Sequence, residues 1–183
     1  MESVKKAIQN LQNDGDDSLA KMLQEKARQH LKAAQENKET KNETALLVQV
    51  LAALKAKIEW SKFAHWTSQG EEFYGDHLLY DRIYEESAPD FDACIEKFLI
   101  QWPEEIANPI QTLKEAQQTL EKHQTESYLN TLMELSQHLL TQIKELYDAL
   151  KTQEKLSLGL DDFIMTLADH HENHLYLLKQ RLK

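Results

Sequence analysis

The chain has 183 residues, with 21 Lys and Arg against 31 Asp and Glu, and a net charge of −10. This length fits one domain, and the acidic balance argues against general affinity for nucleic acid, because neutralising phosphates requires Lys and Arg gathered on one surface. With 4 Gly and 3 Pro the chain has too few turn formers for an all-β fold, so we expect an all-α protein.

Cysteine content and hydropathy indicate the compartment. A single cysteine, Cys94, cannot form an internal disulfide, which favours a reducing environment. The first residues lack the apolar segment of a secretory signal, and no uncharged apolar run approaches the roughly 20 residues that span a bilayer. We therefore expect a cytoplasmic protein without a membrane segment.

Residues 1–40 differ from the rest of the chain in charge. Their basic and acidic side chains are equal in number, so the negative charge belongs to the remainder. A cluster of turn and N-cap residues at 13–18 separates a short helical piece from a second one at about 18–37. We expect an N-terminal helical extension over 1–40, followed by the main domain over 41–183.

The main domain begins with two long helical patterns. From about 43 to 69 no Gly or Pro interrupts the chain, and apolar residues recur at helical spacing: Leu47, Val50, Leu51, Leu54 and Ile58. Gly70 can end this helix, and a second pattern runs from about 71 to 101. Pro89 either kinks this second helix or, with Ser87 as a new cap, splits it.

Three further elements complete the expected fold. Pro103 and Pro109 bound a connection that leads to a short helix at 110–122. A third long helix fits about 125–155, and after a turn around Gly159 a last helix runs from about 160 to the end. Four long helices with one extended middle connection describe a four-helix bundle with a crossover.

Five candidate metal ligands lie close together in the sequence: His65, His77, Asp81, Asp92 and Glu96. Because residues four apart share a helix face, His77 and Asp81 can bind one ion, and Asp92 and Glu96 repeat that spacing. At about 1.5 Å per residue the two pairs lie roughly 16 Å apart along one helix. One ion therefore cannot touch both pairs within one chain.

A helical hairpin adds a third ligand to the first pair. His65 lies five residues before Gly70 and His77 seven after it, so both reach similar heights above the turn. The second pair needs a metal from elsewhere, which an antiparallel second copy of the chain would supply by two-fold symmetry. Imidazole and carboxylate ligands without a thiolate suit Fe(II), Mn(II) or Zn(II), and open carboxylate positions favour iron.

The spacing His-Trp-x3-Gly-x2-Phe-x3-His-x3-Asp-x2-Tyr-x7-Asp-x3-Glu resembles the signature of the Dps family, mini-ferritins named as DNA-binding proteins from starved cells. It is filled by His65, Trp66, Gly70, Phe73, His77, Asp81, Tyr84, Asp92 and Glu96. The resemblance is strong over 46–101 and weaker over 125–183. It implies a ferritin-like fold and a site with His65, His77 and Asp81 on one subunit and Asp92 and Glu96 on its two-fold mate, with Trp66 beside it.

The resemblance also implies a function. It is that of a ferroxidase that binds Fe(II) at inter-subunit sites and oxidises it with hydrogen peroxide or dioxygen, for iron storage and protection from oxidative stress. It further implies a homo-oligomer, in the family a dodecamer. From the ligand types alone, Zn(II) or Mn(II) are possible substitute metals.

Two alternatives of other classes remain open. One is a non-catalytic ferritin-like interaction protein that docks a partner through residues 1–40. The other is a nucleoid-type DNA-binding protein, since Lys5 and Lys6 resemble the basic tails of some Dps proteins. Neighbouring acidic residues cancel the charge of these lysines, which argues against DNA binding.

Two more groups of His and acidic residues stand out on the later helices. They form either a second metal site inside the bundle or an ordinary polar helix surface. Their members are Glu134 with His138, and Asp169 with His170, His171 and His174.

Overall fold

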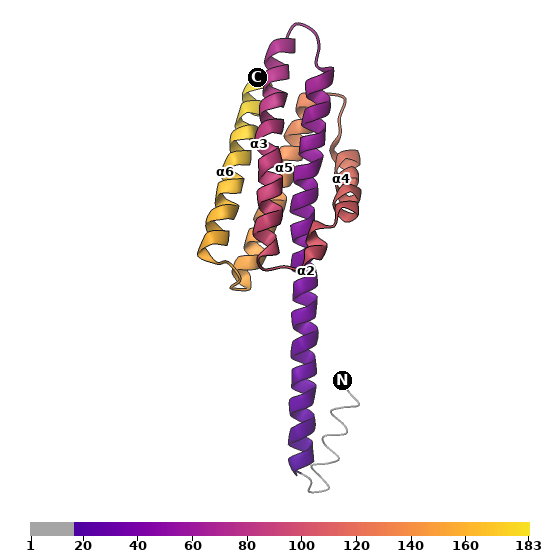
Figure 1. The fold of residues 1–183 in the computed structure, drawn as a ribbon, viewed down its shortest axis with the longest axis vertical. Helices are drawn as coiled ribbons and strands as arrows, with labels where there is room; N and C mark the ends of the chain where they lie inside the picture. Colours follow the sequence, from indigo (N-terminus) through magenta and orange to yellow (C-terminus); the bar gives the residue numbers. More distant parts are fainter. Residues whose placement is uncertain (1–16) are drawn as a thin grey trace. The chain divides into compact units, whose positions relative to one another are not determined.

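A computed structural model describes residues 17–183, without the side chains of residues 17, 19, 20 and 36–39 (Figure 1). Four helices are long: α2 (Asp17–Thr67), α3 (Phe73–Leu99), α5 (Tyr128–Thr152) and α6 (Leu158–Arg181). Between α3 and α5 the chain crosses over through a 3₁₀ turn, η1 (Glu104–Ala107), and a shorter helix, α4 (Pro109–His123). This part of the chain contains no strand, which confirms the all-α prediction.

The chain divides into two compact units between Asn42 and Glu43. Within the first unit the structure describes only residues from Asp17 onward, so Lys5, Lys6 and the expected first helical piece lie outside it. The prediction that a helix ends near residue 37 is wrong, because α2 is continuous to Thr67. No Gly or Pro lies between Asp17 and Thr67, so nothing in the sequence stops the helix.

The second unit is a helical bundle with one main core. All five apolar residues predicted to face inward on α2 are buried. The main cluster takes side chains from each long helix, among them Leu51, Phe98, Leu146 and Ile164. Full burial of a leucine side chain stabilises a fold by about 2 kcal/mol, so the shared core holds the four helices together. None of the helices in residues 17–183 is long and apolar enough to cross a membrane.

Pro89 lies inside α3 without splitting it. Ser87 is buried in the middle of this helix, so the alternative in which it caps a new helix is wrong. Proline removes the hydrogen bond that its N–H would give to the carbonyl of Glu85. Both Pro89 and Glu85 are exposed, so water can hydrate that carbonyl and the helix continues.

Polar caps fix where the later helices begin. The side chain of Asn108 accepts hydrogen bonds from two backbone N–H groups of α4, and Ser127 and Ser157 each accept one at the starts of α5 and α6. Ser157 starts α6 before Gly159, so the turn expected around Gly159 lies earlier. There Glu154 takes the left-handed backbone, with φ of 57°.

A buried carboxylate joins three distant segments of the second unit. Glu43 is 1% exposed; it accepts a 3.0 Å hydrogen bond from Trp102 Nε1 and pairs with Lys155. We expect Glu43→Ala to lower the free energy of unfolding by about 2 kcal/mol, because the indole N–H loses its buried acceptor. Urea denaturation measures this. Glu43→Gln, which retains an acceptor oxygen, should lose less, and an Ala variant as stable as the parent would contradict the assignment.

Candidate metal centre

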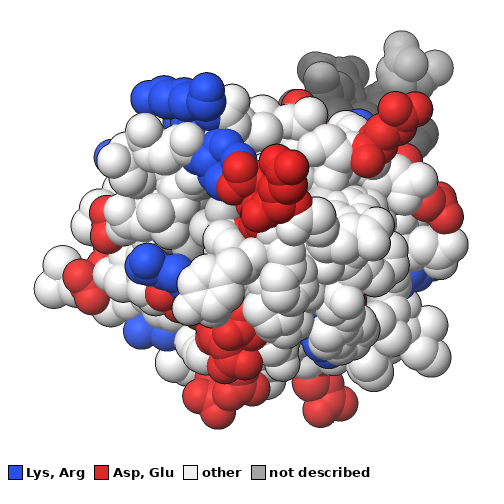
Figure 2. Space-filling model, turned by 90° about the horizontal axis from the view of Figure 1, so that it is seen from above, with Lys and Arg blue, Asp and Glu red and all other residues white. Residues whose placement is uncertain are grey.

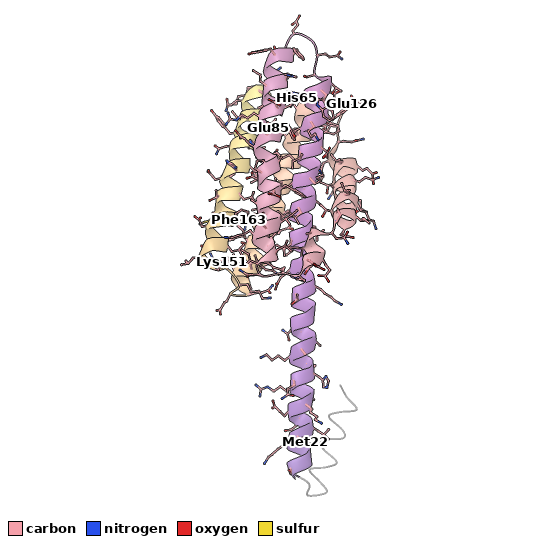
Figure 3. All side chains as sticks on the ribbon, viewed as in Figure 1. Met22, His65, Glu85, Glu126, Lys151 and Phe163 are labelled. Carbon is pink, nitrogen blue, oxygen red and sulfur yellow. The ribbon has the colours of Figure 1, made fainter. Side chains whose placement is uncertain are left out.

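The hairpin between α2 and α3 brings the two predicted histidines together. α2 ends at Thr67, Gly70 takes the left-handed backbone with φ of 92°, and α3 begins at Phe73. His65 therefore lies in the last turn of α2, close to the connection, as Figure 3 shows, and His77 lies at the start of α3. The two imidazole rings stack with 3.9 Å between their centroids.

Reciprocal hydrogen bonds orient these rings. His65 Nδ1 lies 3.2 Å from the carbonyl oxygen of His77, and His77 Nδ1 lies 3.0 Å from the carbonyl oxygen of His65. A carbonyl oxygen only accepts, so each Nδ1 carries the proton and donates it. Each Nε2 is then left with a free lone pair. Histidines that bind metals are held in this way, with the other ring N–H given to a carbonyl or carboxylate.

Asp81 is the third predicted ligand that lies at the hairpin. Its Oδ1 lies 3.7 Å from His65 Nδ1, so one carboxylate and two imidazoles lie together on the hairpin. Asp92 and Glu96 are exposed and lie about 16 Å or more further along α3 at 1.5 Å per residue. Among the side chains that the structure describes, no three His, Cys, Asp or Glu are already arranged to hold a metal ion. One chain by itself thus presents only part of the predicted ligand set at one place.

Large apolar side chains surround the hairpin and remain exposed. They are Phe63, Trp66, Phe73, Tyr74 and Leu78, and Trp66 and Tyr74 are 69% and 74% exposed. Figure 2 looks down on this end of the bundle, where wide uncharged areas lie among the charged groups. Gathered apolar surface of this kind is typical of a face that another protein surface covers.

The histidines on the later helices were expected either to form a second metal site inside the bundle or to lie on a polar helix surface. His171 and His174 are fully buried on α6, so for them the prediction of a polar surface is wrong. Asp169 and His170 are exposed, as a polar surface requires. On α5, the ring of His138 lies tilted against that of His123 of α4, with 4.5 Å between their centroids, and burial lowers the pKa of His138 to about 4.

One buried functional group was missed by the sequence analysis. Lys57 is fully buried on α2 and contacts both His171 and His174. A weak signal exists in the sequence, since Lys57 follows the core residue Leu54 by three positions and so lies on the apolar face of the helix.

No protein-family model and no curated protein matches this chain, but solved structures do. Dps from Thermosynechococcus elongatus matches with a TM-score of 0.67 and 20% identity, over 80% of this chain and 93% of that chain. The Vibrio cholerae O1 Dps protein, described as a member of a superfamily of ferritin-like diiron-carboxylate proteins, gives 0.65 and 20%, over 80% and 92%. An archaeal Dps homologue from Halobacterium salinarum gives 0.65 and 16%, over 80% and 82%. The chain therefore has a Dps-like fold, an all-α ferritin-like four-helix bundle with a crossover.

Proposed function

We propose that this protein is a Dps-like ferroxidase that takes Fe(II) as its substrate at sites shared by two subunits. The observation that carries the proposal is the reciprocal pair of His65 and His77, which leaves a lone pair on each Nε2, with Asp81 Oδ1 3.7 Å from the His65 ring at Nδ1. Neutral imidazoles suit Fe(II), whereas carboxylates stabilise the harder Fe(III) product. The site therefore needs more carboxylates than one chain brings to the hairpin.

A two-fold mate of the same chain would supply these carboxylates. Asp92 and Glu96 share one face of α3 and are exposed, and an antiparallel second copy would bring them to the histidines. The apolar side chains around the hairpin are exposed in the single chain, which supports burial of the hairpin surface between two copies. The description of the Vibrio cholerae structure as a diiron-carboxylate protein supports iron as the metal.

The reaction we propose balances with peroxide as the oxidant. Two Fe(II) ions each give one electron to hydrogen peroxide, its O–O bond breaks, and two hydroxides form beside two Fe(III). Burial at a subunit interface keeps the oxidant and any radical away from other molecules. Dioxygen is the alternative oxidant, and the same site would then oxidise the same Fe(II) substrate. In a closed twelve-subunit shell the ferric product would be stored as mineral.

The native mass tests the assembly that this proposal needs. Light scattering on a size-exclusion column should give a mass near twelve chains of 21.3 kDa, which supports storage in a shell. A dimer would retain the shared site and remove the store. A strict monomer would contradict the proposal, because Asp92 and Glu96 would then have no site to complete.

A further inference from the structure

A polar cluster crosses the interior of the bundle. The ammonium of Lys57, on α2, lies 2.9 Å from His171 Nδ1 and 3.0 Å from His174 Nδ1, both on α6. All three side chains are fully buried. On the other side of the imidazoles, α3 contributes the carboxylates of Glu86 and Asp90.

The donors and acceptors fix the tautomers of both histidines. The protonated form of Lys57 only donates, so in that form both Nδ1 atoms accept from Lys57 and both Nε2 atoms carry the ring proton. His174 Nε2 then donates to Glu86 Oε2 at 2.7 Å. His171 Nε2 faces Asp90 Oδ2 at 3.4 Å, too poorly aligned for a hydrogen bond. Each imidazole therefore lies between a cation and a carboxylate.

This order of cation, imidazole and carboxylate is the one that metal-binding histidines show. There the ring turns one nitrogen to the cation and gives its other N–H to a carboxylate. His171 Nδ1 and His174 Nδ1 lie 3.3 Å apart. Two nitrogens bound at about 2.0 Å to one tetrahedral ion would lie about 3.3 Å apart. Two lone pairs at this separation repel each other unless a positive group lies between them.

We propose that the Nδ1 atoms of His171 and His174 form a cation site inside the bundle, with Glu86 and Asp90 behind them at the Nε2 atoms and the protonated Lys57 as the resident cation. Without the lysine, the two Nδ1 atoms would be free to bind a divalent transition metal. This inference is independent of the proposed ferroxidase function.

Burial and the nearby carboxylates act on the charge of Lys57 in opposite directions. Burial lowers the pKa of Lys57 to about 7, against the raising effect of the charges on Asp90 and Glu86. Burial lowers the pKa of His174 to about 4, so its Nδ1 remains an acceptor at neutral pH. The lysine is thus held in the interior by the groups around it, and its removal leaves those groups without their cation.

The test is to remove the lysine and supply a metal. Co²⁺ is the probe, because its visible absorption becomes intense in a tetrahedral site, and a His65→Ala/His77→Ala background removes the hairpin histidines. In this full-length background we expect Lys57→Ala to gain one Co²⁺ per chain. His171→Ala and His174→Ala should abolish this binding, and Glu86→Gln should weaken it by about 10- to 100-fold.

Lys57→Met is the matched control, since it removes the charge but fills the space, and it should not gain Co²⁺. A helical Lys57→Ala variant that binds no Co²⁺ would overturn the proposal. Binding that survives the loss of both histidines would overturn it as well. So would Co²⁺ binding at His171 and His174 in the background that retains Lys57.

A measurement on the unaltered chain covers the case in which Lys57→Ala does not fold. Nitrogen-15 NMR of the histidine rings should show the proton on Nε2 of both His171 and His174 at pH 6, below the pKa of about 7 of Lys57. A proton on Nδ1 of either ring would mean that Lys57 does not donate to it, and the cation site would be disproved.

Discussion

Replacing both His65 and Asp81 by Ala is expected to abolish rapid Fe(II) oxidation while the helices remain intact. His65 supplies one Nε2 lone pair, and its backbone carbonyl also accepts from His77. Asp81 Oδ1 lies 3.7 Å from His65 Nδ1. Groups that merely support metal ligands cost 10- to 100-fold when lost, so removing two ligands should lower the rate by more than about 100-fold. The initial rise of ferric absorbance after peroxide is added to Fe(II)-loaded protein measures this rate.

A matched control removes the same residue types elsewhere. Asp169 and His170 are exposed neighbours on α6, and Asp169→Ala/His170→Ala should oxidise Fe(II) at the parental rate. Circular dichroism should show equal helix content in all three proteins. Parental oxidation by His65→Ala/Asp81→Ala would disprove the assignment of the hairpin as the site.

The second large effect is a loss of stability in acid. The pKa of His174 falls from 6.5 to about 4 on folding, mainly because burial disfavours the charged ring. An unfolded chain takes up a proton at this residue below pH 6.5, whereas the folded chain resists it until about pH 4. The contribution of His174 to stability is therefore complete above pH 6.5 and declines as the pH falls towards 4, by roughly 3 kcal/mol. His171 is shifted in the same direction by burial.

Lys57 extends the trend to alkaline pH. Its pKa falls from 10.5 to about 7 on folding, so the unfolded chain holds more protons between these values and stability rises with pH there too. Urea denaturation at a series of pH values measures the whole profile. His174→Asn retains an acceptor near the Nδ1 position but cannot titrate, so its profile should be flatter between pH 4 and 6.5. An unchanged slope in this variant would contradict the role given to His174.

The long helices of the bundle could be predicted because their signals are local. The apolar stripe from Leu47 to Ile58 follows helical spacing, and the structure buries all of it. The helix end expected near residue 37 was wrong because the prediction rested on a change in composition. Polar helix-forming residues continue a helix as well as apolar ones do. The effect of Pro89 could not be predicted, because proline leaves one helical carbonyl without its hydrogen bond. The free energy that this costs depends on whether the carbonyl is exposed to water, and the exposure is set by the packing.

For the candidate site, sequence spacing predicted proximity and little more. The positions of His65 and His77 about Gly70 predicted that the two rings reach similar heights, and they stack. Their reciprocal hydrogen bonds depend on the crossing of two helices, which no spacing encodes. The cluster of Lys57 could not be predicted, because its partners lie 114 and 117 residues away along the chain.

The most direct measurement of a site shared by two subunits is complementation between two inactive variants. One variant carries His65→Ala and His77→Ala, and the other carries Asp92→Ala and Glu96→Ala. Each alone should oxidise Fe(II) no faster than buffer. After the two are unfolded and refolded together in equal amounts, random pairing by two-fold symmetry should restore about a quarter of the parental rate, because each mixed pair contains one complete site. Mixed pairs that form, as shown by mass spectrometry, and yet remain inactive would contradict the shared site.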